Sequence, residues 1–475
     1  MIPISAAQIS EILSPATISG NPDNIAESVT IDSRTAGAGD CFFAIIGERL
    51  DGHDFVDQAL AAGAGIVVVE RPIQTTEPAG ADTAIIRVDD TTAALQALAG
   101  WLRQRLNPTV VAITGSLGKT TTKELAAELL GTRYSVHATP GNLNNHWGLP
   151  LTLLGLEARH EVMVAELAMS RAGEIGALSR LADPSIGVIT NVAPAHMENF
   201  ADLDAVATAK GELARELPAA GTLIVNADDP RTDAMPELLA PHVTRVVRFG
   251  CGTSADVRAT DLAAGPSGGW TLNLHIDSAS RSIDLRLAGA PGVSCFLAAA
   301  ATAHALEISI DEIAAAAATL EPLPNRGAIR LTGGITLMDE SYNASPLAVN
   351  AALETLASLA TTGRRIAVLG DMLEMGDWTD RVHREAGKKA AEIDVDLLVA
   401  VGAGAGLMAE GARATGMARQ GIHAFDTAAE AASWLAPRLR DGDTVLVKGS
   451  RAVHLERVVH AVTTATTVPN GVGGR

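Results

Sequence analysis

The sequence predicts an α/β protein with three domains. Its 475 residues are 47% hydrophobic and only 19% charged, which is enough apolar material for several buried cores. Continuous apolar runs alternate with helix-like stretches along the chain, a pattern typical of parallel sheets covered by helices on both faces. A further stretch, VVAITGSLGKTTTKELAAELL at residues 110–130, has the strand–loop–helix layout of a phosphate-binding loop and predicts a P-loop-type central sheet.

The first domain is expected over residues 1–107 and is a small α/β unit. The runs CFFAIIG and GIVVVE predict buried strands, and HDFVDQALAAGA predicts a helix between them. We expect the boundary at Asn107-Pro108, because proline disfavours helix at the residue before it.

The central domain is expected over residues 108–322, with strands at VVAIT, VMVAEL, IGVITNV and TLIVNAD. The long apolar region CFLAAAATAHALEISIDEIAAAAATL is interrupted by charged residues, so it predicts two core helices and no membrane span. The segment EPLPNRG, at 321–327, leads to a Rossmann-like domain over residues 323–475, whose strands are RRIAVLGD, DLLVAVG and DTVLVKGS. The last eight residues, VPNGVGGR, are typical of a frayed tail.

Charge and cysteine usage restrict the class of partner. The formal net charge of −19 disfavours nucleic acid and anionic membrane. The three cysteines, Cys41, Cys251 and Cys295, stand far apart and predict reduced thiols in the cytoplasm. The first residues lack the basic and apolar regions of a signal peptide. We therefore expect a cytoplasmic monomer without membrane insertion that acts on small molecules.

The phosphate-binding loop contains the first candidate site residues. Its two glycines allow backbone N–H groups to approach phosphate oxygens, Lys119 adds a positive charge, and Thr120 offers a hydroxyl to Mg²⁺. The loop departs from the common G-x-x-x-x-G-K-[ST] pattern, because Ile113 stands where the first glycine would be. The expected nucleotide-binding residues are Gly115, Ser116, Leu117, Gly118, Lys119, Thr120 and Thr121.

Polar residues at the ends of predicted strands are further candidates. Glu166 ends VMVAE, at the edge where parallel sheets bind ligands, and its carboxylate suits Mg²⁺ or is simply solvated. His196 follows a later strand and is either a metal ligand or a structural histidine. In DSRT, the guanidinium of Arg34 fits a diphosphate, although Asp32 there also suits an Asx-turn.

The loop TGSLGKT resembles the ATP loop of the Mur ligase family, the cytoplasmic enzymes that build the peptidoglycan stem peptide. Other segments resemble this family in order and spacing, and together they cover nearly the whole chain: VTIDSRTAGAGDCFFAIIGERLDGHDFVDQAL, TPGNLNNHWGLPLTLL, VAELAMSRAGEIGALS, TNVAPAHMENFADLDAVATAKGEL, LMDESYNASPLAV, LGDMLEMG and VLVKGSR. The most specific of them are SYNASP and GDMLEMG, since the ligase that adds the third stem residue carries other signatures.

This resemblance implies an ATP-dependent amide ligase. The resemblance implies that the reaction joins D-alanyl-D-alanine to a UDP-N-acetylmuramoyl-tripeptide through an acyl phosphate. The resemblance implies two Mg²⁺ ions held by Thr120, Glu166 and His196, and a carbamylated lysine, Lys210 in ATAKGEL, that bridges to the second ion. The catalytic residues it implies are Lys119, Lys210 and His196. Without the resemblance, Lys210 reads as an ordinary exposed helix lysine.

The resemblance also implies contacts to the nucleotide and the substrates. The nucleotide-binding residues beyond the loop are Asn191, Asn325, Arg326 and Asp339. The substrate-binding residues are Ser33, Arg34, Asn142, Asn144, Asn145, Asn343, Lys448 and Arg451. Lys448 and Arg451 lie in C-terminal motifs together with Asp371, Glu374 and His383, and these five residues rank lower. One departure is Ser170-Arg171, where many relatives carry Asn-His, so no role is assigned to this pair.

Two other functions fit parts of the sequence. A ligase of the folylpolyglutamate synthetase type shares the central core, but the N-terminal domain with DSRT argues against it. A nucleotide-binding or switch protein that performs no ligation is the other alternative. It lacks support because no switch loop is evident and because Lys210 and His196 would have no role.

Overall fold

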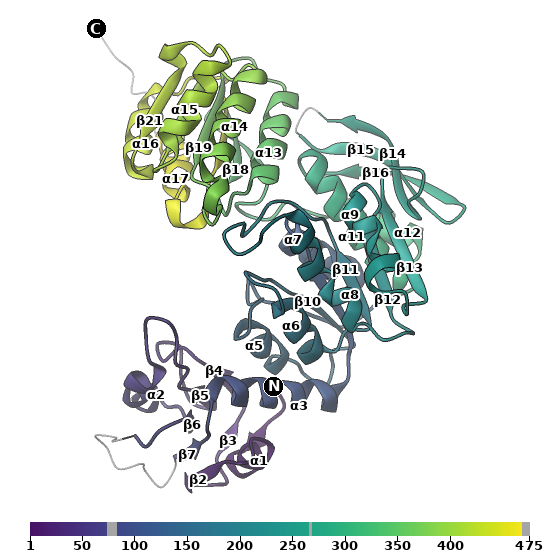
Figure 1. Cartoon of the computed structure of the whole chain (residues 1–475), viewed down its shortest axis with the longest axis vertical. Helices are drawn as coiled ribbons and strands as arrows, with labels where there is room; N and C mark the ends of the chain where they lie inside the picture. The colour runs from purple at the N-terminus through teal and green to yellow at the C-terminus, as the bar shows by residue number, and fades with distance from the viewer. Residues whose placement is uncertain (74–82, 266–267, 468–475) are drawn as a thin grey trace.

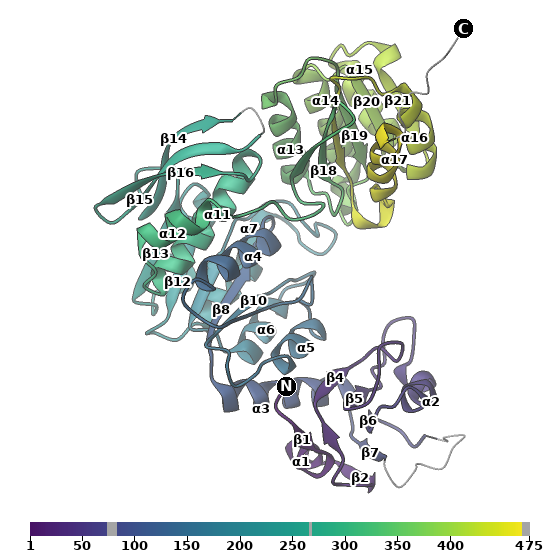
Figure 2. The same ribbon diagram turned by 180° about the vertical axis from the view of Figure 1, so that it is seen from behind.

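The computed structural model describes residues 1–73, 83–265 and 268–467. Three bodies follow one another in chain order, with the N-terminal body at one end, the central body in the middle and the C-terminal body at the other end (Figures 1 and 2). Each body is built around its own sheet, so the predicted α/β class with three domains is confirmed. The tail expected at residues 468–475 lies outside the described residues.

The N-terminal body contains a five-stranded sheet in the order β2-β7-β6-β5-β4, parallel except for the β2–β7 pair. The strands are β2 (Thr17–Gly20), β4 (Ser28–Thr30), β5 (Asp40–Phe43), β6 (Ile66–Val69) and β7 (Ala84–Arg87); β1 (Ile4–Ser5) and β3 (Ile25–Ala26) form a separate pair. Both predicted strands are present as β5 and β6, and both are apolar on two faces because each face is covered. The helices are α1 (Ala6–Ile12), α2 (Val56–Ala61) and α3 (Thr91–Leu106).

Helix α3 joins the N-terminal body to the central one (Figure 1). Its buried Leu95, Leu98 and Leu102 belong to one apolar core that also contains Leu149 and Leu153 of the central helix α5 (Gly148–Leu154). The two bodies therefore share a continuous core. The chain connection near residue 107 does not coincide with a gap in that core.

The central body has a nine-stranded sheet in the order β16-β15-β14-β13-β12-β11-β8-β10-β9. The strands are β8 (Thr109–Thr114), β9 (Val136–Ala138), β10 (Val162–Glu166), β11 (Ile186–Ile189), β12 (Thr222–Asn226), β13 (Arg245–Gly250), β14 (Val257–Ala264), β15 (Trp270–Ile276) and β16 (Ala279–Leu285). The strands from β8 to β13 are parallel, as predicted. The antiparallel extension β14–β16 was not anticipated, because its residues alternate between buried and exposed and form no continuous apolar run.

Helices cover both faces of the central sheet. One face contacts α5, α6 (Glu174–Ala182), α7 (Leu203–Lys210) and α8 (Glu212–Glu216), and the other contacts α4 (Lys119–Leu130), α11 (Gly289–Ala305) and α12 (Ile310–Ala317). The short helices α9 (Pro230–Asp233) and α10 (Met235–Leu239) follow β12. The two predicted alanine-rich core helices are α11 and α12. Within the described part of the chain, no helix is both long and apolar enough to cross a membrane.

The C-terminal body has a six-stranded sheet in the order β17-β18-β22-β19-β20-β21, parallel except for β17–β18. The strands are β17 (Ala328–Thr332), β18 (Ile335–Glu340), β19 (Arg365–Gly370), β20 (Leu397–Val401), β21 (Ile422–Phe425) and β22 (Thr444–Lys448). One face is covered by α13 (Pro346–Ser358), α14 (Thr379–Glu392) and α15 (Ala405–Ala414), and the other by α16 (Ala428–Leu435) and α17 (Glu456–Thr467). All the buried residues of these two cores come from the C-terminal body itself.

Candidate active site

The phosphate-binding loop connects β8 to α4, as the sequence predicted. Gly115 has φ 151° and Gly118 has φ 83°, conformations that L side chains rarely adopt. A Cβ at residue 115 would lie 1.9 Å from Oγ1 of Thr190, and a Cβ at residue 118 would lie 2.7 Å from Sγ of Cys295. The loop is thus held so tightly against β11 and α11 that only glycine fits at these two positions.

Hydrogen bonds to the loop that follows β11 hold the phosphate-binding loop in place. The amide of Asn191 accepts from the backbone N–H of Leu117 (2.9 Å) and donates to the carbonyl of the same residue (3.0 Å). The hydroxyl of Ser116 donates to the carbonyl of Ala193 and accepts from its N–H, both at 2.9 Å. Asn191 therefore holds the loop with both of its amide atoms.

Lys119 begins α4 and faces the cavity in front of the loop. Its ammonium donates to the carbonyl of Gly115 at 2.9 Å. Burial lowers the pKa of Lys119, the nearby charge of Glu166 opposes that shift, and Arg326 adds to it. A half-buried cation thus lies between a carboxylate of the central body and a guanidinium of the C-terminal body.

Glu166 is buried at the end of β10. Its Oε1 accepts from Nδ2 of Asn144 at 2.7 Å, whereas its buried Oε2 has no hydrogen-bond partner among the described residues. The buried Thr120 lines the same cavity. An unpartnered carboxylate oxygen with a hydroxyl nearby is a donor set that fits a hard divalent cation. The described residues contain no cluster of three or more histidine, cysteine or acidic side chains suited to a metal.

His196 lines the same cavity, and Lys210 is buried at the end of α7. Nδ1 of His196 lies 2.5 Å from Oε2 of Glu374. This contact is an ion pair, but its angles do not meet the criteria of a hydrogen bond. Burial lowers the pKa of His196, Glu374 opposes this, and Lys210 and Lys119 add to it. Burial also places the pKa of Lys210 well below its usual value, with a further contribution from Lys119. The interpretation of Lys210 as an exposed helix lysine is therefore wrong, because this side chain is only 3% exposed.

A cavity of about 520 Å³ brings most of the predicted residues together. Its walls come from the phosphate-binding loop, from the ends of β10 and β11, and from the C-terminal body. The predicted site residues that line it are Ser116, Leu117, Gly118, Lys119, Thr120, Thr121, Asn142, Asn144, Glu166, His196, Asn325, Arg326, Asn343, Lys448 and Arg451. A second cavity, of about 500 Å³, adjoins the same loop and is lined by Asn191.

The C-terminal wall of the larger cavity is organised around Tyr342. The guanidinium of Arg326 lies 3.8 Å from the centre of its ring, and that of Arg451 lies 6.0 Å away. Lys448 is buried, with its ammonium 3.0 Å from Oε2 of Glu340 and 3.2 Å from the carbonyl of Asn343. Both cations have an acidic neighbour: the buried Lys448 pairs with Glu340, whereas Arg451 lies 3.7 Å from Glu456 and its side chain is 60% exposed.

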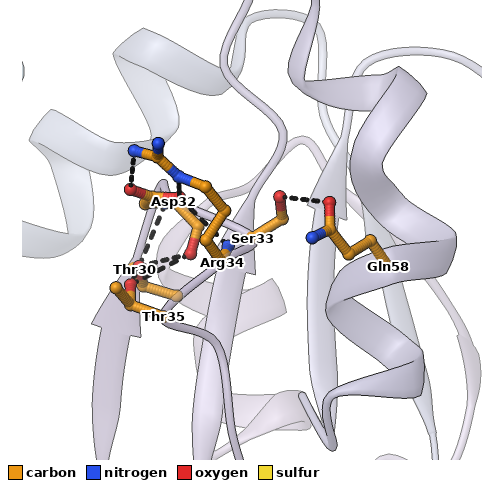
Figure 3. Close-up of polar contacts among 6 residues, drawn as sticks. All are labelled: Thr30, Asp32, Ser33, Arg34, Thr35 and Gln58. Atoms are coloured by element: carbon orange, nitrogen blue, oxygen red, sulfur yellow. Dashed lines mark hydrogen bonds and ion pairs between the residues drawn. The ribbon is translucent and has the colours of Figure 1, made fainter.

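The DSRT segment lies in the N-terminal body, outside the residues that line the two cavities. Figure 3 shows Arg34 folded back on Asp32, with hydrogen bonds of 2.8 and 2.6 Å between the guanidinium and the carboxylate. These bonds and the backbone N–H of Arg34 lower the pKa of Asp32 to about 2. Ser33 donates to Oε1 of Gln58 at 3.0 Å. The Asx-turn at Asp32 does not prevent Arg34 from contacting a ligand, because the Arg34 side chain is 80% exposed.

Several predicted residues have a local role in the fold. Oδ1 of Asn145 accepts from two N–H groups at the start of α5. The backbone N–H groups of Ser170 and Arg171 donate to Glu174 at the start of α6. In the C-terminal body, His383 is buried between the backbone of Met372 and that of Thr379. Asp371 accepts from the N–H groups of Ala403 and Gly404, and one oxygen of the buried Asp339 accepts from Ser341.

Two residues of the site were not singled out from the sequence. Glu340 pairs with Lys448, and Lys123 is a completely buried cation on α4. Glu340 carries a weak signal, because it ends a strand next to SYNASP. Lys123 follows the phosphate-binding loop in TTTKE, where a lysine normally indicates a solvated helix face, so its burial depends on tertiary packing.

Comparison with known families covers all three bodies. Residues 26–101 match the catalytic domain of the Mur ligase family, residues 113–303 match the Mur ligase middle domain, and residues 325–451 match the Mur ligase glutamate ligase domain. The matched regions include the DSRT segment, the phosphate-binding loop and the motifs of the C-terminal body.

Whole-chain relatives agree with these matches. A UDP-N-acetylmuramoyl-tripeptide–D-alanyl-D-alanine ligase of Mycobacterium tuberculosis is 35% identical, over 97% of this chain and 98% of its own length. A crystal structure of MurF from Acinetobacter baumannii is similar with a TM-score of 0.87 and 32% identity, over 97% of this chain and 99% of that one. MurF ligase from Thermotoga maritima in complex with ADP has a TM-score of 0.80 and 30% identity, over 92% and 97% of the two chains. The chain belongs to the Mur ligase family.

Proposed function

We propose that this protein is an ATP-dependent ligase that joins D-alanyl-D-alanine to a UDP-N-acetylmuramoyl-tripeptide in peptidoglycan precursor synthesis. The observation that carries the proposal is the larger cavity, where a phosphate-binding loop, an unpartnered buried carboxylate oxygen and cations of the C-terminal body converge. The relatives that match almost the whole chain, including its N-terminal body, carry this activity in their names.

The nucleotide is assigned to the phosphate-binding loop. Residues Gly115 to Thr121 are assigned to its phosphates, with the backbone N–H groups at the start of α4 as donors, because those of Ser116 and Leu117 already donate to Asn191. Lys119 then lies where charge accumulates during phosphoryl transfer. We assign Asn191, Asn325, Arg326 and Asp339 to the remainder of the nucleotide, with Asn191 acting largely through the loop that it holds.

Two Mg²⁺ ions are assigned to this cavity, which contains oxygen donors suited to them. Thr120 and Oε2 of Glu166 would hold the first ion, and His196 with a modified Lys210 would hold the second. When bound, Mg²⁺ neutralises phosphate charge as a Lewis acid. The contact with Glu374 occupies Nδ1 of His196 and leaves Nε2 available as the ligand, and a carboxylate at the other ring nitrogen orients a metal-binding histidine.

Lys210 is assigned as a carbamylated lysine. Its buried amine has a strongly lowered pKa, and a neutral amine attacks CO₂ to give a carbamate anion and a proton. An anion at this position would balance the charge of the nearby Lys119. We expect Lys210→Ala to be almost inactive and to recover part of its activity when short-chain carboxylates are added. An amine that remains unmodified in bicarbonate, with no rescue by carboxylates, would contradict the assignment.

The substrates are assigned to opposite parts of the molecule. Ser33 and Arg34 face the diphosphate of the UDP substrate, and Asn142, Asn144 and Asn145 lie along the path to the phosphate-binding loop. The dipeptide is assigned to Asn343, Lys448 and Arg451, with Arg451 the freer of the two cations.

The reaction follows from this placement. The carboxylate of the tripeptide attacks the γ-phosphorus, ADP leaves, and an acyl phosphate forms. The amine of D-alanyl-D-alanine then attacks the acyl carbon, and phosphate leaves as the amide forms. Lys119 stabilises the developing negative charge. Closure of the C-terminal body about residues 321–327 excludes water from the acyl phosphate.

We retain the domain boundaries at 1–107, 108–322 and 323–475 as part of this proposal. The enzyme is expected to act as a monomer in the cytoplasm, on small molecules and without nucleic acid or membrane insertion. These expectations rest on the composition of the chain and on the resemblance to the family.

The decisive experiment supplies ATP and UDP-muramoyl-tripeptides whose third residue is diaminopimelate or lysine. It measures the mass of the product and kcat/KM. The acceptors compared are D-alanyl-D-alanine, D-alanine and L-alanyl-L-alanine. We expect D-alanyl-D-alanine to be strongly preferred, because contacts to its second residue position the amine. A preference for a free amino acid or for a folate would indicate another ligase. Phosphate release without an amide product would indicate a protein that performs no ligation.

A further inference from the structure

The fully buried Lys123 has no role in the reaction described above. It lies one helical turn after Thr120 on α4. Its ammonium donates to the carbonyls of Thr139 at 2.5 Å and Gly141 at 3.2 Å, and lies 2.6 Å from Oε1 of Glu124. Burying an ammonium is costly unless its partners are well placed. An apolar side chain would fill the same space without that cost, which suggests that the contacts of Lys123 serve a purpose other than packing.

The two carbonyls that Lys123 holds belong to the segment that fixes Glu166. Oγ1 of Thr139 accepts from the backbone N–H of Glu166 at 3.0 Å. Further along the segment, Nδ2 of Asn144 donates to Oε1 of Glu166 at 2.7 Å, and the carbonyl of Asn144 accepts from Ala168 at 2.9 Å. The segment thus forms hydrogen bonds with the backbone N–H and with Oε1 of Glu166. Oε2 is buried and has no hydrogen-bond partner among the described residues.

We propose that Lys123 is a positioning residue that sets the distance between the Thr120 hydroxyl and the free oxygen of Glu166, and so preforms the cation site of the nucleotide. Helix α4 carries Thr120, and the segment 139–145 orients Glu166. Lys123 is the side chain that ties these two elements together. It does not touch the cation or the nucleotide. This inference rests on the proposed function, because it takes the nucleotide to bind with Mg²⁺ at Thr120 and Glu166.

The experiment measures binding of ADP by calorimetry over a range of Mg²⁺ concentrations, without any acceptor, and then steady-state kinetics. Lys123→Met keeps the length of the side chain and removes its donors. We expect a folded protein that binds ADP normally without Mg²⁺ but needs roughly 10–100-fold more Mg²⁺ to reach full affinity, the usual effect of removing a group that orients a metal ligand. In kinetics kcat should fall, whereas KM for the UDP-tripeptide should stay unchanged.

Two variants serve as controls. Arg103 is likewise a buried cation that donates to two carbonyls, those of Ala182 and Asp183, but it lies on α3, away from the cavity. Arg103→Met should lower thermal stability and leave the Mg²⁺ dependence of ADP binding unchanged. Glu124→Gln removes the ion pair and keeps both carbonyl contacts, so its Mg²⁺ dependence should also match the wild type.

A double-mutant cycle tests the route of the effect. If Lys123 acts through Asn144 and Glu166, Lys123→Met and Asn144→Ala should shift the Mg²⁺ dependence by amounts that do not add. Should Lys123→Met fail to fold, Lys123→Arg takes its place, because it keeps a cation but misplaces its donors. A normal Mg²⁺ dependence in the folded Lys123 variants, or fully additive effects, would overturn the inference. Failure of the proposed function would appear separately, as wild-type protein that binds Mg²⁺ and ADP but forms no amide.

Discussion

Burial lowers the pKa of both Lys119 and Lys210, but the surroundings of the two amines differ. Lys119 keeps a carboxylate nearby and borders an open cavity, so it is suited to stabilise phosphate charge. Lys210 is enclosed, and no ion pair to it is present in the described part of the chain. We therefore propose an electrostatic role for the lysine at one position and reaction with CO₂ at the other.

Lys119→Ala should fold normally and lower kcat by at least roughly 10²-fold, the scale for losing one preorganised charge-stabilising group. The measurement is steady-state turnover, with circular dichroism as the check on folding. Lys389→Ala is the matched control, because this lysine lies outside both cavities and pairs with the exposed Glu354, so its loss should leave turnover unchanged. A Lys119→Ala enzyme with nearly wild-type kcat would remove the phosphate assignment.

Lys210→Met should be inactive yet more stable, by about 1 kcal/mol at neutral pH. The folded pKa of Lys210 lies below the unfolded value, so the unfolded state binds more protons between these two values and stability rises with pH there. The penalty that methionine removes is therefore largest at low pH and shrinks as pH approaches the unfolded pKa. Urea unfolding of both proteins at about pH 6 and about pH 9 in CO₂-free buffer measures this. A stability difference that grows with pH would contradict the prediction.

At the scale of elements, the phosphate-binding loop is restrained by the segment that follows β11 and by α11. Asn191 and Ser116 hold its backbone, and β11 and α11 leave no room for side chains at its two glycines. The loop gains its geometry from neighbours that are distant in the sequence. The rigidity of the loop therefore depends on the packing of the whole central sheet.

Gly115→Ala should abolish nucleotide binding, because the new Cβ would collide with Thr190 in a backbone conformation that alanine rarely adopts. Gly173→Ala is the control, since Gly173 also has positive φ (88°) but has open space around its Cβ position. The control should lose about 1 kcal/mol of stability and retain ADP affinity. Equal ADP affinities of the two folded variants, measured by calorimetry, would count against a tightly held loop.

The sequence predicted the elements whose signal is local. Parallel strands such as β8 and β10 appear as continuous apolar runs, and the glycine loop follows from its spacing. The antiparallel strands β14–β16 were missed because half-exposed strands lack such runs. The burial of Lys210 and the contact of His196 with Glu374 were not predictable either, since both arise from residues distant in the chain.

At the scale of the whole molecule, the three bodies are not equally joined. The N-terminal and central bodies share one apolar core through α3, whereas the cores of the C-terminal body contain only its own buried residues. The C-terminal body contacts the central body through the partly buried Trp378, through α13 beside α11 and through the contact of His196 with Glu374, but among the described residues it contributes no fully buried side chain to the shared core. Motion is therefore expected at residues 321–327 rather than near residue 107.

Limited proteolysis should show this difference. In the absence of ligands, cleavage within residues 321–327 should separate the C-terminal body, while residues on both sides of position 107 stay together in one fragment. ATP, Mg²⁺ and the UDP-tripeptide together should slow this cleavage, because they bridge the cavity. Mass spectrometry of the fragments identifies the cut sites. Preferential cleavage near residue 107 would contradict the assignment of the hinge to residues 321–327.

The shared core under α3 also limits how this protein can be recombined with its relatives. A chimaera joined at residue 107 would place the α3 of one parent against the α5 of the other, and their apolar side chains would have to interlock without having been selected together. A junction before Thr91 would instead keep Leu95, Leu98 and Leu102 with the helix that they contact. A segment that is exchanged between relatives should therefore begin at α3 and continue through the central sheet.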